Sequence, residues 1–122
     1  MTAILSNLQA VHSAIARAAQ LAQRNAADII LLAVSKTVSA EVVREAYNAG
    51  QTAFGENYLQ EALDKMAAMR DLPIEWHFIG PIQSNKTRAI AENFSWVHSV
   101  DRLKIAERLS EQRPANLAPL NI

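Results

Sequence analysis

The sequence contains no cysteine, so disulfides, thiolate metal sites and cysteine nucleophiles are all excluded. Glycine occurs three times, and no G-x-G-x-x-G pattern follows any strand-like segment, which leaves a dinucleotide-binding fold without motif support. Twelve acidic residues balance twelve basic residues. This zero formal charge gives no electrostatic reason to expect nucleic acid or an anionic membrane as a partner.

Long apolar runs are also missing from the chain. No run reaches the roughly 18 residues that a membrane helix requires. The N-terminal segment MTAILSNLQAVHSAIARAAQ lacks the basic region and the unbroken apolar core of a secretory signal. We therefore expect a soluble, cytoplasmic protein.

What the 122-residue chain does contain is an alternation of helix-like and strand-like segments, in a composition that is 50% hydrophobic. Helical periodicity predicts helices over 3–24, 40–49, 58–70, 85–93 and 102–112. Short apolar runs predict strands over 29–35, 52–57, 75–80 and 95–100, with 120–122 as the opening of a fifth.

Local signals set several of these boundaries. Ser39 is expected to cap the second helix and Gly50 to end it. Ser84 or Asn85 is expected to open the fourth helix, and Asp101 to cap the fifth.

One helix followed by four βα units predicts an α/β fold with a parallel sheet. The continuous aliphatic run at 29–35 suits a strand buried on both faces, as such sheets require. An open doubly wound sheet and a (β/α)8 barrel are the two competing architectures. Because a barrel has eight strands in typically ~250 residues, residues 1–122 read as a single incomplete domain, the N-terminal half of a TIM-like barrel. The chain also stops inside an apparent strand, so we expect a piece of a longer protein.

Two polar side chains stand where parallel strands end, which is where active residues of such folds collect, and a third, His77, lies within the strand 75–80 between Trp76 and Phe78. Lys36 ends the first strand; it is either solvated at the rim or held in a partly desolvated pocket, where an amine can form a Schiff base with an aldehyde. Asn57 is either a strand-end cap or a ligand to a small molecule. His77 is either a satisfied core histidine or a ring that packs on a flat cofactor.

The remaining charged and metal-binding residue types carry little signal. The three histidines, His12, His77 and His98, do not have the spacing of metal ligands, so no metal is expected. Lys86 and Arg88 open a helix and form either part of its solvated face or a pair of cations that reach an anion.

Four segments, in register along the chain, resemble a known family. They are LLAVSK at 31–36, FGENYLQEALDK at 54–65, WHFIGPIQSNKTRAI at 76–90 and VHSVDRLKIAERL at 97–109. Together they resemble the pyridoxal phosphate homeostasis proteins, whose barrel is similar to the N-terminal domain of alanine racemase. The likeness covers essentially the whole chain.

The resemblance implies a fold-type III barrel that binds pyridoxal 5'-phosphate (PLP), with Lys36 carrying the cofactor as a Schiff base. It implies that Asn57 and His77 line the ring side of the pocket and that Ser84 and Asn85 lie near its mouth. The implied function is intracellular vitamin B6 homeostasis: binding and buffering PLP and delivering it to apo forms of PLP-dependent enzymes, without an established catalytic turnover.

One departure keeps other functions open. In the resembled family the cofactor phosphate is held by the last strands and a late helix N-terminus, and nothing within these 122 residues supplies such a cradle. A PLP-dependent amino-acid racemase or lyase on the same barrel is the alternative, and a racemase would add a second base from a C-terminal β domain. An α/β scaffold with an idle lysine is a third hypothesis.

Overall fold

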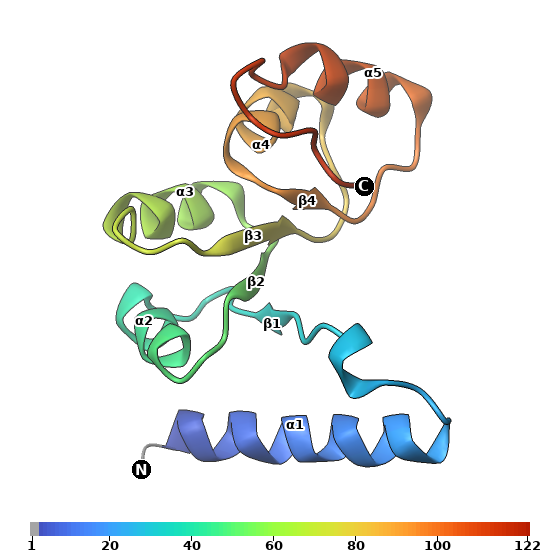
Figure 1. Ribbon diagram of the computed structural model, residues 1–122. Helices are drawn as coiled ribbons and strands as arrows, with labels where there is room; N and C mark the ends of the chain where they lie inside the picture. The colour runs from blue at the N-terminus through green and yellow to red at the C-terminus, as the bar shows by residue number, and fades with distance from the viewer. Residues whose placement is uncertain (1–2) are drawn as a thin grey trace.

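The computed structural model describes residues 3–122 as one helix followed by four βα units (Figure 1). The α-helices are α1 (Ala3–Leu21), α2 (Ala40–Asn48), α3 (Leu59–Ala68), α4 (Thr87–Asn93) and α5 (Leu103–Gln112). The strands are β1 (Ala33–Val34), β2 (Ala53–Glu56), β3 (Glu75–Phe78) and β4 (Trp96–Val97). Two short 3-10 turns, η1 (Ala26–Asp28) and η2 (Ser84–Lys86), complete the order.

The four strands form a single parallel sheet in the order β1-β2-β3-β4, as the repeated βα units predict. The register aligns Val34, Gly55, His77 and Trp96 across the sheet. A parallel bridge between Trp96 and Asn121 extends the sheet beyond β4, which confirms 120–122 as the opening of a fifth strand.

Helices cover one face of this sheet. Phe54 and Trp76 point to that face, with ring centroids 6.0 Å apart, and Phe78 meets Phe94 edge-on at 5.3 Å. The core formed there also takes buried side chains from the helices: Val43, Ala62, Ile90, Ala91, Ile105 and Leu109. Figure 1 shows α2, α3 and α4 following one another along the sheet, with α1 and α5 at opposite ends.

The other face, which we call the inner face, is open within residues 3–122. A Cβ placed on Gly55 would lie 3.4–3.5 Å from side-chain atoms of Leu32 and Ile79, so these three residues share that face. Val34, on the same row, is 52% exposed. The first strand is therefore not buried on both faces, and that expectation is wrong: only Ala33 and Val34 pair as a strand, and only one side of them is covered.

The capping expectations have mixed outcomes. Ser39 accepts a hydrogen bond from the Val42 amide, and Gly50, with φ of 108°, follows the end of α2 in a conformation suited to glycine. Asp101 does not cap α5. Arg102 occupies the N-cap position without a side-chain hydrogen bond, and the Asp101 carboxylate lies 3.3 Å from the Arg102 guanidinium instead.

Helix α1 packs loosely on the rest of the chain. Ala19 is its one buried residue, and the helix ends at Leu21, three residues before the predicted end. A hollow of about 250 Å³ separates it from β1 and α2. Within residues 3–122, no helix has both the length and the apolar character needed to span a membrane.

Truncating the core and the surface should have contrasting effects on stability. Phe54→Ala should lower the free energy of unfolding by about 3–5 kcal/mol, because a ring that is 2% exposed leaves a cavity against Trp76. Leu21→Ala, at a side chain that is 88% exposed, should change it by less than about 0.5 kcal/mol. Urea denaturation followed by circular dichroism measures both, and equal effects would contradict the packing described.

Candidate functional site

The carboxyl ends of the strands meet at one edge of the sheet. The Ser35 amide donates to the Gly55 carbonyl at 2.9 Å, and the Ile79 amide donates to the Glu56 carbonyl at 2.9 Å. The His98 amide donates to the Phe78 carbonyl at 3.0 Å. These bonds hold the residues just beyond each strand side by side, as expected for a parallel α/β fold.

Lys36 is exposed and lies in the turn that follows β1. The register ends with the pair Val34 and Gly55; Lys36 then lies in the turn after β1, and Asn57 directly follows β2. The structure thus places the two predicted residues at neighbouring strand ends. Because Lys36 is exposed, residues 3–122 by themselves do not form the expected desolvated pocket around it.

Asn57 carries an unusual feature. Its Oδ1 atom is buried and has no hydrogen-bond partner among residues 3–122. Gly80, with φ of 89°, passes so close that an added Cβ would lie 3.6 Å from the Asn57 Cβ. A buried acceptor without a donor costs about 1–3 kcal/mol, and each such atom in a folded protein calls for an explanation. Glu56 Oε1 is the other buried side-chain oxygen without a partner among residues 3–122, and a role for Asn57 in a ligand site stays a prediction.

A hollow of about 380 Å³ adjoins Asn57 at this edge. Its lining comes from the start of α3 and from the segment after β3, and it includes Tyr58, Gln60, Gln83 and Lys86. Polar and apolar groups are both present, as in sites that orient a small molecule.

His77 sits on the inner face one row below the strand ends. Its Nδ1 lies 2.8 Å from His98 Nε2, and its Nε2 lies 2.7 Å from Glu75 Oε1, so both ring nitrogens have partners. The Trp96 ring stacks parallel to it at a centroid distance of 5.6 Å. Both ring nitrogens of His77 are thus satisfied within the chain, and its place beside a cofactor ring stays a prediction.

Burial lowers the pKa of His77 below the usual 6.5, and the nearby His98 acts in the same direction. The Glu75 carboxylate opposes this shift but does not overcome it. The imidazole is therefore held in its neutral form more firmly than a solvated histidine.

On the helix-covered face, directly behind Lys36, lies an ionic cluster that sequence reasoning missed. Lys65 Nζ is 2.9 Å from Glu56 Oε2 and 2.8 Å from Glu61 Oε1, and the Lys65 and Glu56 side chains are 6% and 0% exposed. Ser35 Oγ also donates to Glu56 Oε2. The i,i+4 spacing of Glu61 and Lys65 signals a helical pair, but nothing in the sequence indicates that it is buried.

Bonding to Lys65 lowers the pKa of Glu61, and the hydrogen bond from the Thr37 amide acts in the same direction. Glu61 is therefore ionised and bridges α3 to the turn that carries Lys36.

Ser84 and Asn85 are not among the residues that line the hollow beside Asn57. The Ser84 carbonyl accepts from Thr87 Oγ1 and Arg108 Nε, so this residue joins η2 to α4 and α5. Asn85 is exposed. Their predicted place near a pocket mouth stays a prediction.

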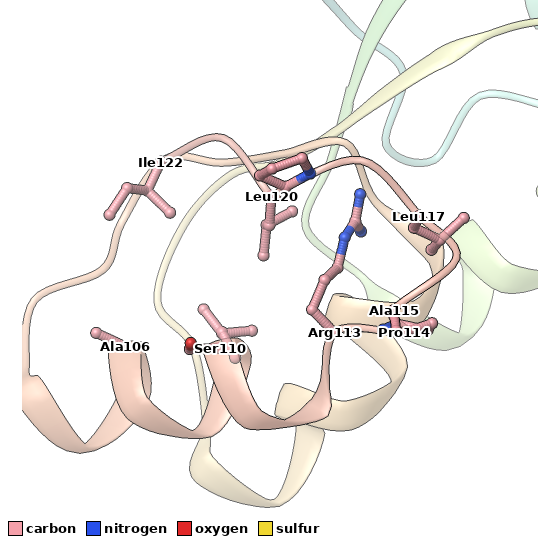
Figure 2. Close-up of a pocket in the computed structure, with 10 residues that line it drawn as sticks. Ala106, Ser110, Arg113, Pro114, Ala115, Leu117, Leu120 and Ile122 are labelled. Atoms are coloured by element: carbon pink, nitrogen blue, oxygen red, sulfur yellow. The ribbon is translucent and has the colours of Figure 1, made fainter.

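Another hollow, of about 400 Å³, lies away from the strand ends (Figure 2). Leu120 and Ile122 face Ala106 and Ser110 of α5 across it. The Arg113 guanidinium at its edge donates to the carbonyls of Ala91, Phe94 and Ala118, so these donors are used in bonds within the chain. Among residues 3–122 there is no cluster of three or more side chains able to hold a metal ion.

Fold and site together define a parallel α/β protein that presents a lysine amine and an amide with an unpartnered oxygen at adjacent strand ends. No protein-family model matches the chain. Named relatives do match it. The chain is 66% identical to the pyridoxal phosphate homeostasis protein of Pseudomonas aeruginosa over 122 residues, which cover all of this chain and 53% of the relative. It is 52% identical to the protein of the same name from Escherichia coli K12 over 125 residues, again with 100% and 53% coverage.

Solved structures agree with these relatives. PipY of Synechococcus elongatus, determined both without PLP and with PLP bound, is 47% identical with a TM-score of 0.69, over 80% of this chain and 46–47% of that chain. The crystal structure of an unknown protein from Bifidobacterium adolescentis gives a TM-score of 0.78 at 29% identity, over 89% of this chain and 49% of that chain. The family resemblance is confirmed: along its whole length the chain is homologous to pyridoxal phosphate homeostasis proteins, and it spans about half the length of these curated relatives.

The depressed pKa of His77 predicts a pH dependence of stability. The unfolded chain binds a proton near the ordinary value of 6.5 and the folded chain resists it, so the stability is present above that pH and is lost as the pH falls below it. The free energy of unfolding should therefore drop between about pH 7.5 and about pH 5.5, with a shallower slope in His77→Asn. His12→Asn, on the exposed surface of α1, is the matched control and should keep the wild-type slope. Identical slopes in all three proteins would contradict the assignment.

Proposed function

We propose that this protein binds PLP, holds it as a Schiff base on Lys36 and serves in intracellular vitamin B6 homeostasis. One observation carries the proposal: an exposed lysine in the turn after β1 and the buried, unpartnered oxygen of Asn57 just after β2 lie at the carboxyl ends of neighbouring parallel strands. The relatives named pyridoxal phosphate homeostasis protein and the PLP-bound structure of PipY support it.

The residues present fit the ring end of this cofactor. Lys36 would provide the amine, which an aldehyde requires, and arginine cannot replace it because the guanidinium stays protonated. Asn57 would offer an acceptor oxygen to a hydroxyl donor such as the one on the pyridine ring. PLP supplies a reactive aldehyde on an electron-withdrawing ring, and condensation with an amine releases water.

The protein's own groups would act as a holder. Lys36 supplies the nucleophile, and Asn57 orients the ligand through its amide. The stacked row of His77, Trp96 and His98 forms a flat wall on the inner face, one residue row below. Together these groups would keep a reactive aldehyde out of free solution, and release would make the cofactor available to apo-enzymes that need it.

The architecture that we propose for the whole protein is a (β/α)8 barrel. Four βα units in sequential order, with helices on one face, have the arrangement of half such a barrel. The inner face, which is open here, would then line the barrel interior.

Lys36 should be the only lysine that captures the cofactor. After incubation with PLP and reduction with borohydride, mass spectrometry should find the adduct on the peptide containing residues 31–43. Lys36→Ala and Lys36→Arg should both lose the adduct and the visible absorbance of the bound cofactor. Lys104→Ala, on the exposed side of α5, is the control and should behave as wild type. An adduct on another lysine, with Lys36 unmodified, would overturn the assignment.

Removing the unpartnered acceptor should weaken binding without abolishing the adduct. Asn57→Ala should cost about 1–3 kcal/mol of PLP binding free energy, the scale of one buried hydrogen bond. Asn93→Ala removes the same side chain from the exposed end of α4 and should leave affinity unchanged. Absorbance titration measures both constants, and equal affinities in the two variants would exclude Asn57 from the site.

A further inference from the structure

The turn that carries Lys36 has a backbone conformation that needs outside support. Thr37 has φ of 63°, in the left-handed region that β-branched residues avoid. Such a residue costs on the order of 1–3 kcal/mol and persists only where its surroundings hold it. The strain lies one residue from the amine that the proposed function uses.

Side chains of α3 and β2 hold the residues on both sides of Lys36. Glu61 Oε1 accepts the Thr37 amide hydrogen at 2.5 Å, and Lys65 Nζ donates to the Ser35 carbonyl at 2.5 Å. Glu56 accepts from Ser35 Oγ. The residue before Lys36 and the residue after it are thus fixed, while Lys36 itself remains exposed.

Lys65 is suited to this role by its number of donors. Its ammonium group has three N–H donors, and three oxygens lie within bonding distance: the Ser35 carbonyl, Glu56 Oε2 and Glu61 Oε1. Burial of an ion pair is weak evidence that the pair stabilises the fold, because apolar side chains of similar size often give equal stability. An apolar side chain could fill the space but could not bond the carbonyl that precedes Lys36.

We propose that Glu61 and Lys65 are positioning residues for Lys36. They form a clamp on Ser35 and Thr37 that keeps Thr37 in its left-handed conformation, fixes the turn that carries Lys36 and so aims the Lys36 amine at the incoming aldehyde. This inference rests on the proposed function, because it concerns the same lysine. Misplacement of a reacting group by about 1 Å can slow a reaction by about 100-fold, so a clamp on the backbone has a measurable effect on the rate.

The test uses the full-length protein and compares its Glu61→Ala variant with its Asp64→Ala variant. Both variants remove one carboxylate from the same helix. Asp64, however, is exposed and accepts a hydrogen bond from Gln60, which is not part of the ionic cluster. Two quantities are measured: amide hydrogen exchange at Thr37 without cofactor, and the rate at which borohydride-trapped PLP appears on Lys36.

Glu61→Ala should speed Thr37 exchange and slow capture on Lys36, each by about tenfold, the scale of one lost hydrogen bond to a charged group. Asp64→Ala should change neither. Glu61→Gln keeps an acceptor oxygen for the Thr37 amide. It should therefore restore most of the Thr37 protection and most of the capture rate on Lys36, which a variant that failed to fold could not do.

Lys65 is tested in the double variant Glu56→Gln with Lys65→Met, because Lys65→Met alone would leave the Glu56 charge buried and unpaired. Capture on Lys36 should again slow by about tenfold, since the tether to the Ser35 carbonyl is lost. An unchanged capture rate in this variant would remove Lys65 from the clamp.

The outcomes separate the two proposals. If the wild type forms no adduct on Lys36, the proposed function and the positioning role fail together. If the wild type forms the adduct and Glu61→Ala matches Asp64→Ala in capture rate, the function stands and the clamp is overturned, even where Thr37 exchange is faster. Faster exchange together with slower capture supports the clamp.

Discussion

The structure around the candidate site depends on the ammonium group of Lys65. This one group joins β1 through the Ser35 carbonyl, β2 through Glu56 and its own helix through Glu61. Removing it would leave two carboxylates facing each other without compensation, one of them fully buried. All three N–H donors of Lys65 are bonded, which offsets part of the free-energy cost of burying these charges, while Glu56 Oε1 has no partner among residues 3–122.

The two faces of the sheet have different chemistry because alternate residues of a strand point to opposite sides. Phe54, Trp76 and Phe78 go to the helices and form the core. Gly55 and His77 go to the inner face, where the absence of a side chain at Gly55 leaves room for Leu32 and Ile79. The helix-covered face of the sheet thus carries the hydrophobic core, whereas the candidate functional residues lie on the inner face and at the strand ends.

Much of the fold is predictable from local pattern. Helix periodicity and the cap at Ser39 gave elements that the structure contains, and four βα repeats gave a parallel sheet in sequential order. Boundaries were less predictable. The run 29–35 looks uniformly apolar, yet only Ala33 and Val34 pair with β2, and the chain turns at residues 36–37 soon afterwards. Asp101 has a capping side chain, but its carboxylate lies against the Arg102 guanidinium instead.

The sequence by itself determined the order of elements, the parallel arrangement, the strand ends that carry Lys36 and Asn57, and the strand that contains His77, because these follow from hydrophobic period and chain connectivity. Only the tertiary structure decided what surrounds them. The pairing of His77 with both Glu75 and His98, the orphaned oxygen of Asn57 and the clamp from Glu61 and Lys65 join residues from different elements. Such contacts depend on how strands and helices pack in three dimensions, and a single sequence carries no direct record of which side chains meet.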